Sequence, residues 1–191
     1  MVVGLGILIY PTVSNWINQL NGSYVIQTFQ TRMENADIIQ ERARAVSYNQ
    51  KLQDRSWDNS GYASDEYEEI LDFGGGMMGY IEIPKIRVNL PIYHGTEEET
   101  LAKGVGHMPQ SAFPVGGDGN HCVLTGHTGL PSAKLFNDLT ELKEEDLFQL
   151  HVLNDTLYYQ VDQIKVVLPS AYIHPTLIFS SLNFSKNVAN E

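Results

Sequence analysis

Apolar side chains recur at helical spacing in the first quarter of the chain. The spacing is close to i, i+3, i+4 and i+7, which is typical of a helix with one buried face. The residues that follow it are Ile26, Phe29, Met33, Ala36 and Ile39 or Gln40. No proline follows Pro11 in this stretch. The pattern predicts helix from residue 12 to about 55, as an arm or hairpin packed on a domain. A coiled coil is disfavoured because the apolar positions keep no long heptad.

The first ten residues are all apolar or glycine, and Pro11 ends the run. As a helix they would span about 15 Å, half of a hydrocarbon core of about 30 Å. The first basic residue is Arg32, so the charged region that opens a signal peptide is not seen. Two interpretations stay open: the end of a membrane anchor that starts upstream of Met1, or a peripheral or packed apolar end. We expect residues 1–14 to be a residual membrane-anchor segment and 15–52 to be the helical arm.

Turn signals dominate residues 53–77. Residues 57–61 and 73–76 are rich in the small and polar residues typical of turns, and an acidic stretch, 65–72, lies between them. Acidic stretches are most often solvated faces. We therefore expect a surface loop or linker here.

Short segments rich in β-branched and aromatic residues follow from Met78 onward. The predicted strands are 80–84, 88–93, 122–125, 147–153 and 157–167, with a hairpin turn at Asn154 and Asp155. Residues 97–103 and 131–139 are each long enough for a single helical turn. Strands at this spacing indicate a barrel or sandwich, so the expected class is mainly β with an N-terminal helical arm. After Pro169 no pattern predicts a regular element.

Composition narrows the class of protein further. The chain has 191 residues, of which 42% are apolar, enough to build the core of one domain. Its single cysteine excludes an internal disulfide and a zinc site built on paired cysteines, and the six histidines form no metal-binding signature. The net charge of −11 argues against nucleic acid as a partner, since phosphate binding needs clustered Lys and Arg.

Two residues are candidates for chemistry. Cys122 lies five residues before His127, and this odd spacing puts them on opposite faces of a regular strand. The thiol is therefore more simply a small buried apolar residue than a nucleophile activated by that histidine. His127 follows a predicted strand, and Gly126 and Gly129 would let the backbone turn sharply and present its ring. A catalytic role and a turn histidine both stay open for it.

An ordered set of segments resembles the class C, pilin-polymerising sortases of Gram-positive bacteria. The segments are 79–86, 90–93, 104–107, 111–117, 124–136 and 159–164, together with 9–14 near the start. The strongest is the Thr-Gly-His-Thr-Gly block at 125–129 with its flanks, and the likeness covers about residues 1–169. The resemblance implies an eight-stranded β-barrel and a cysteine transpeptidase without a cofactor. Such an enzyme cleaves a sorting signal after Thr through a thioacyl intermediate and, in class C, passes the acyl group to a pilin lysine.

The resemblance assigns three catalytic side chains, and this chain matches one of them. His127 matches the catalytic histidine, which protonates the leaving amine. The nucleophilic cysteine belongs to a Thr-Leu-x-Thr-Cys motif that does not occur here, and Cys122 lies on the family's fourth strand rather than its seventh. The arginine that steadies the oxyanion has no match, because no arginine follows Arg87. Ser180, in a faint echo of the cysteine motif, comes too early in the chain.

Class C sortases also carry a lid with an Asp-Pro-aromatic motif that plugs the site. No Asp-Pro dipeptide occurs in the lid-like loop, residues 53–77. Trp57 and Phe73 are the candidates for the plugging side chain, and an ordinary loop aromatic is the alternative.

The likeness ends near Pro169, where the resemblance predicts two further strands. We therefore expect residues 78–169 to form a partial sortase barrel and 170–191 to be an out-of-family tail. The resemblance then predicts an inactive, truncated sortase, anchored through its N-terminus on the outer face of the cell membrane. Its partners would be pilin subunits with a C-terminal sorting signal. A non-catalytic sortase-like binding module and a nonfunctional gene fragment are the alternatives.

Overall fold

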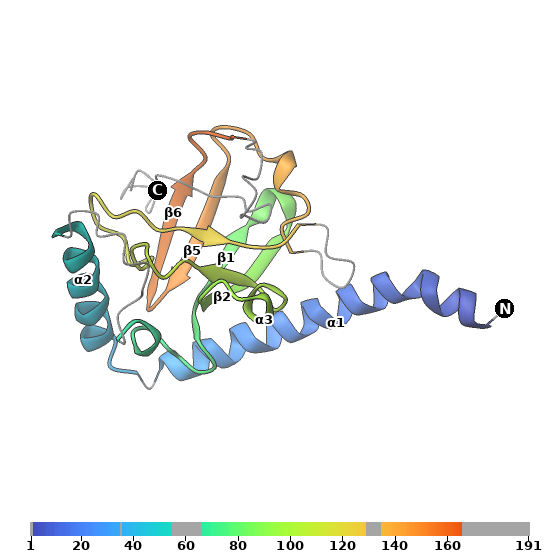
Figure 1. Cartoon of the computed structure of the whole chain (residues 1–191), viewed down its shortest axis with the longest axis horizontal. Coiled ribbons are helices and arrows are strands. Elements are labelled where there is room, and N and C mark those ends of the chain that lie inside the picture. The colour runs from blue at the N-terminus through green and yellow to red at the C-terminus, as the bar shows by residue number, and fades with distance from the viewer. Residues whose placement is uncertain (1, 35, 55–65, 129–134, 166–191) are drawn as a thin grey trace, which may run out of the picture.

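The computed structural model describes residues 2–34, 36–54, 66–128 and 135–165. Two helices, α1 (Val2–Met33) and α2 (Ile38–Asp54), precede a curled six-stranded sheet that forms a half-barrel (Figure 1). The strands are β1 (Met77–Ile83), β2 (Val88–His94), β3 (Val105–His107), β4 (Leu124–Thr125), β5 (Leu147–Val152) and β6 (Asp155–Gln160). Their order across the sheet is β4-β3-β2-β1-β5-β6. The predicted mainly β fold with an N-terminal helical arm is confirmed.

β1 lies inside the sheet and pairs antiparallel with β2 and β5. β5 and β6 form the predicted hairpin, but Val152 lies opposite Asp155, so the turn comes one residue earlier than expected. β6 also ends at Gln160, well short of the predicted residue 167. β2 and β3 are parallel, and the predicted helical turn, α3 (Glu98–Leu101), connects them. The sequence did not predict β3, because three residues are too few for an alternating pattern.

The apolar stripe of the helical arm is buried as predicted up to the end of α1. Its buried members are Ile26, Phe29 and Met33. The prediction is wrong for Ile39, which is 84% exposed. The two helices are separated between Met33 and Ile38, so α2 starts with a new phase and buries Ala45 and Tyr48 instead.

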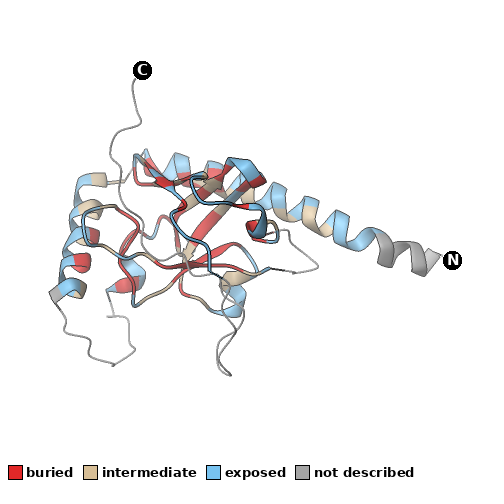
Figure 2. Cartoon of the chain, turned by 90° about the horizontal axis from the view of Figure 1, so that it is seen from above, coloured by how far each residue is buried: buried red, intermediate tan, exposed pale blue. Residues whose placement is uncertain are grey.

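Helix α1 continues through Pro11, so the apolar N-terminal run and the arm form one helix. Its C-terminal part packs on the outer face of the sheet, where the Phe29 ring meets the Tyr80 ring edge to face at 6.2 Å. Its N-terminal part extends beyond the sheet and is largely exposed where its side chains are described (Figures 1 and 2). Within the described residues, no helix combines the length and the hydropathy that crossing a membrane requires.

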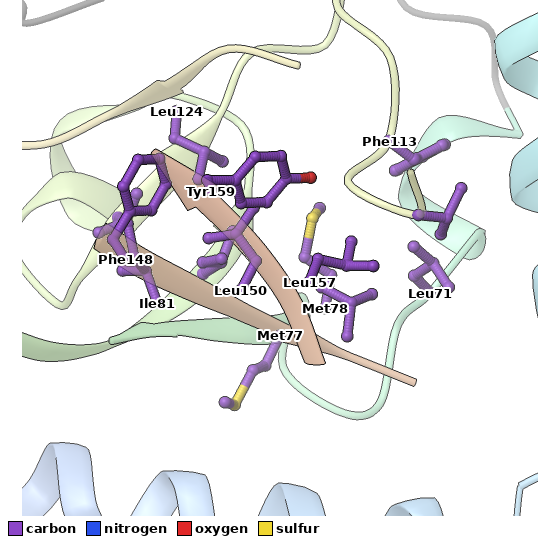
Figure 3. Packing of buried hydrophobic residues seen from close by; sticks show 14 of the residues in the cluster. Leu71, Met77, Met78, Ile81, Phe113, Leu124, Phe148, Leu150, Leu157 and Tyr159 are labelled. Atoms are coloured by element: carbon purple, nitrogen blue, oxygen red, sulfur yellow. The ribbon is translucent and has the colours of Figure 1, made fainter. Parts of the chain in front are cut away.

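Apolar side chains fill the inner face of the half-barrel. Phe148 and Leu150 of β5 gather there with Leu157 and Tyr159 of β6 (Figure 3). The Phe148 and Tyr159 rings stack with their centroids 5.3 Å apart. Phe113, from the long loop between β3 and β4, is 1% exposed and closes the same core. The loop that leads toward β4 is therefore fixed by packing rather than by strand pairing alone.

The apolar side chains of residues 66–76 are buried in the core and the acidic ones are exposed, so the expectation of a surface loop is wrong for the apolar positions alone. Tyr67, Ile70 and Leu71 are at most 2% exposed, although acidic residues surround them in the sequence. Leu71 adopts a φ of 61°, and its backbone N–H donates a hydrogen bond of 2.9 Å to the Glu41 carboxylate of α2. These three apolar residues follow helical spacing for a single turn only, which is too short to predict a buried element among acidic neighbours. Residues 55–65 lie outside the described part of the chain.

Candidate catalytic site

His127 lies two residues after the end of β4, close to a point where the sheet fixes the backbone. β4 pairs with β3 through Thr125 opposite Gly106, and Thr125 is 3% exposed. The backbone carbonyl of His127 accepts a hydrogen bond of 3.1 Å from the Phe136 N–H. The His127 side chain is 21% exposed, so part of the ring is accessible at the end of the strand. This is the placement expected for a side chain that meets a substrate.

Gly126 allows a buried ring to approach the backbone closely and does not form a sharp turn. Its φ lies outside the left-handed region, and a Cβ at this position would lie 2.6 Å from Cδ2 of Phe136. Phe136 is completely buried. The expected turning role of Gly126 is therefore wrong: the missing side chain lets this ring pack directly against the backbone beside His127. Gly129 lies outside the described residues.

The Nε2 atom of His127 is buried and has no hydrogen-bond partner among the residues that the structure describes. The Oε1 atom of Glu98 lies 3.4 Å from it, a distance that suits an ion pair with a protonated ring. Glu98 opens α3, and its side chain is 79% exposed. A carboxylate from another part of the chain thus faces the orphaned ring nitrogen.

Cys122 has the properties of a structural residue. Its side chain is partly buried and packs against the core. It lines a small cavity together with Phe113, Asn120 and Tyr159. Burial raises the pKa of its thiol to about 12. A thiol that stays protonated at neutral pH is a poor nucleophile. The geometry therefore supports the interpretation of Cys122 as a small apolar side chain.

A buried polar cluster around His107 supports the strand that pairs with β4. His107 ends β3 and is fully buried, and its Nε2–H donates to the Ala112 carbonyl at 2.9 Å. The hydroxyl of Tyr67 lies 2.9 Å from its Nδ1. Burial lowers the pKa of His107 to about 4, so the ring is neutral at physiological pH. Because Tyr67 belongs to residues 66–76, the cluster joins that segment to the sheet.

Of the two candidates for a lid side chain, Trp57 and Phe73, the structure describes Phe73. Trp57 lies outside the described residues, as does Ser180. Phe73 is 8% exposed, and its ring meets Phe29 of α1 edge to face at 5.4 Å. A lid role for either aromatic residue stays a prediction. Across the described ranges, no three histidine, cysteine or acidic side chains gather as a metal ion would require.

A family model, that of the sortase domain, matches residues 81–186, more than half of the chain. The chain belongs to the sortase family. The sortase match includes His127 and extends past Pro169, the point at which the resemblance in the sequence ends.

Solved class C sortases are similar to this chain in both sequence and fold, which confirms the predicted resemblance. Sortase C1 from Streptococcus agalactiae is 38% identical, with a TM-score of 0.71 over 82% of this chain and 84% of that chain. Sortase C of Streptococcus pneumoniae is 37% identical, with a TM-score of 0.68 over 82% of each chain. Sortase C-1 from Actinomyces oris is 42% identical, with a TM-score of 0.60 over 69% of this chain and 77% of that chain.

Curated sortases match over a shorter stretch. Sortase D of Bacillus subtilis (strain 168) is 34% identical over 93 residues, which are 49% of this chain and 44% of that protein. Sortase A of Bacillus anthracis is 28% identical over 96 residues, which are 50% of this chain and 44% of that protein. The chain therefore spans less than half the length of the curated relatives it matches.

Proposed function

We propose that this chain carries the histidine of a class C sortase active site, and that His127 is that residue. The carrying observation is its ring, held just after β4 with a side chain that is 21% exposed, so that part of the ring can meet a substrate. In the family's reaction a cysteine sulfur attacks the carbonyl carbon of the Thr in the sorting signal. The C–N bond then breaks, and the histidine gives its proton to the leaving amine. In the second step a lysine amine displaces the sulfur from the thioester and yields its proton to the histidine.

The 191-residue chain by itself does not catalyse this transfer. Its one cysteine is Cys122, whose raised pKa of about 12 keeps the thiol protonated, and no arginine follows Arg87. The first step then lacks a thiolate, and the developing oxyanion lacks its cation. The proposal is therefore a sortase scaffold that supplies one of the three catalytic groups.

The proposed partners are pilin subunits that carry a C-terminal sorting signal, with a pilin lysine as the acceptor. The support is the similarity to the sortases C of two streptococci and of Actinomyces oris, at 37–42% identity. A chimera tests both the partner class and the role of His127. It joins residues 1–165 of this chain to the last two strands of Streptococcus agalactiae sortase C1, with their cysteine and arginine.

We expect the chimera to cleave a fluorogenic sorting-signal peptide and His127→Ala to lower its rate by a factor of about 100 or more. His121→Ala is the matched control, because His121 lies nearby in the sequence and is exposed. The control variant should keep the rate of the chimera. Undiminished cleavage by the His127→Ala chimera would contradict the proposed role.

We propose further that the protein works at the outer face of the cell membrane, with α1 as the contact. No charged residue occurs before Arg32, and α1 exposes apolar and aromatic side chains: Ile9, Tyr10, Val13, Trp16, Ile17, Leu20 and Tyr24. Aromatic rings of this kind favour the membrane–water interface. Flotation with phospholipid vesicles tests the contact. The full chain should float, and replacing Trp16, Leu20 and Tyr24 by serine should abolish flotation.

A stable binding module is the second candidate function. The favouring observation is a buried reciprocal pair: the Asn49 amide donates to the Phe113 carbonyl at 3.1 Å and accepts from the Phe113 N–H at 2.7 Å. Such specific buried contacts are typical of a unique fold. A cooperative thermal transition of the purified chain, with binding of a sorting-signal peptide and no cleavage, would support this candidate.

A further inference from the structure

The contact between Glu98 and His127 joins two segments that are far apart in the sequence. Oε1 of Glu98 lies 3.4 Å from Nε2 of His127. That nitrogen is buried from solvent and lacks a hydrogen-bond partner among the described residues. A buried ring nitrogen is rarely left unpaired in a native protein. A small rotation of the Glu98 side chain, which is 79% exposed, would bring its carboxylate into hydrogen-bond range.

Glu98 can lie close to His127 because β3, the strand next to β4, contains Gly106. A Cβ at Gly106 would lie 2.4 Å from the Gly95 carbonyl oxygen and 2.9 Å from Cδ2 of Leu101. Only glycine therefore lets the turn that carries α3 pack this closely on β3. Gly106 is the register partner of Thr125, two residues before His127. The same glycine thus brings Glu98 to the end of β4.

We propose that Glu98 is a positioning residue for His127: its carboxylate accepts the Nε2–H hydrogen bond and fixes the orientation and tautomer of the ring. This inference rests on the proposed catalytic role of His127. In the neutral ring the lone pair then lies on Nδ1, so Nδ1 is the nitrogen that takes and returns the proton of the amine. A carboxylate that orients a catalytic histidine in this way acts through the histidine, without contact to the substrate.

The neighbouring acidic residues do not share this role. The Glu97 carboxylate lies over its own loop, where a Cβ at Gly95 would meet it. Glu99 is exposed and takes part in no ion pair among the described residues. Glu99→Ala therefore removes the same charge from the same helical turn and leaves the contact with His127 in place. It is the matched control for Glu98→Ala.

The test is the tautomer of His127, read from long-range proton–nitrogen correlations of ¹⁵N-labelled histidine in the full 191-residue chain at pH 8. His127→Ala assigns the signals. We expect the proton on Nε2 in the unsubstituted chain and in Glu99→Ala, and a mixture of both tautomers in Glu98→Ala. Glu98→Gln should keep the Nε2–H tautomer, because its amide oxygen can still accept the hydrogen bond.

The inference is overturned if Glu98→Ala leaves the His127 correlations unchanged, or if Glu99→Ala changes them equally. In the chimera, Glu98→Ala should lower kcat about tenfold with little change in KM, and Glu98→Gln should restore part of the loss. The two proposals fail separately. Full activity of the His127→Ala chimera would refute the proposed function, whereas an unchanged tautomer in Glu98→Ala would refute only the role of Glu98.

Discussion

The Phe136 ring packs on the backbone of Gly126, and the Phe136 N–H donates to the carbonyl of His127. These two contacts fix the residue before the candidate catalytic histidine and the histidine itself. Phe136 belongs to the described segment 135–165, which is separated from His127 in the sequence by residues outside the described part of the chain. The position of His127 thus depends on packing between segments as well as on the pairing of β4.

Gly126→Ala should destabilise the fold by about 1–3 kcal/mol, because the new methyl group would lie 2.6 Å from the buried Phe136 ring. Urea denaturation measures the free energy of unfolding. Gly22→Ala is the control: its Cβ would meet only Pro91, at 4.0 Å, and alanine favours helix by up to about 1 kcal/mol. Equal stability of Gly126→Ala and the unsubstituted chain would contradict the close packing.

His107 should make the fold sensitive to acid. Its pKa is lowered from 6.5 to about 4 in the folded state, so the unfolded chain binds more protons between these values. Stability is then fully present above pH 6.5 and is lost as the pH falls toward 4, by about 3 kcal/mol. Denaturation at pH 7.5 and at pH 4 measures the loss.

His107→Gln is the control for this pH dependence, because the carboxylates titrate equally in both proteins. The variant should lose less stability between the two pH values than the unsubstituted chain, by the contribution of His107. Identical losses in the two proteins would show that burial of His107 does not control the response to acid.

The thiol of Cys122 should resist alkylation in the folded chain. Its pKa is raised from 9.0 to about 12, which lowers the thiolate fraction below pH 9 about a thousandfold. The rate of reaction with iodoacetamide at pH 8 should fall accordingly when the folded chain is compared with the chain in urea. A folded-state rate within tenfold of the unfolded rate would contradict the burial of this thiol.

Asn49→Ala should cost about 2–4 kcal/mol of stability. The amide of Asn49, at 2% exposure, pairs with both the N–H and the carbonyl of Phe113, and its loss leaves two buried backbone groups without these partners. Gln53→Ala is the control, since Gln53 on the same helix makes exposed hydrogen bonds to the 118–120 loop. Urea midpoints that shift equally for the two variants would rule out a special role for Asn49.

Local patterns predicted most of the regular elements. β1, β2, β5 and β6 carry β-branched and aromatic residues over six or seven positions, long enough for alternation to be read. The stripe through Phe29 and Met33 likewise predicted the buried face of α1. The phase of α2 was missed, because nothing local indicates where a helix breaks and restarts between Met33 and Ile38.

Of the residues in the candidate site, the sequence singled out His127 but not its neighbours in space. His127 stands in a motif that can be read along the chain, but its surroundings depend on distant residues. Glu98 approaches it because Gly106 lets α3 pack on β3, and β3 is too short to predict. Gly126 was expected to turn the chain, since a sequence does not reveal which ring will pack on a glycine. Contacts between segments therefore account for what the sequence did not predict.

Whether the 191-residue chain is inactive by itself can be measured as cleavage of a fluorogenic sorting-signal peptide by the purified chain. Streptococcus agalactiae sortase C1 serves as the positive control, and His127→Ala and Cys122→Ser as variants. We expect the chain and both variants to cleave the peptide no faster than it hydrolyses on its own, because Cys122 is held as a thiol and no arginine follows Arg87. Turnover by the unsubstituted chain that His127→Ala abolishes would contradict this expectation.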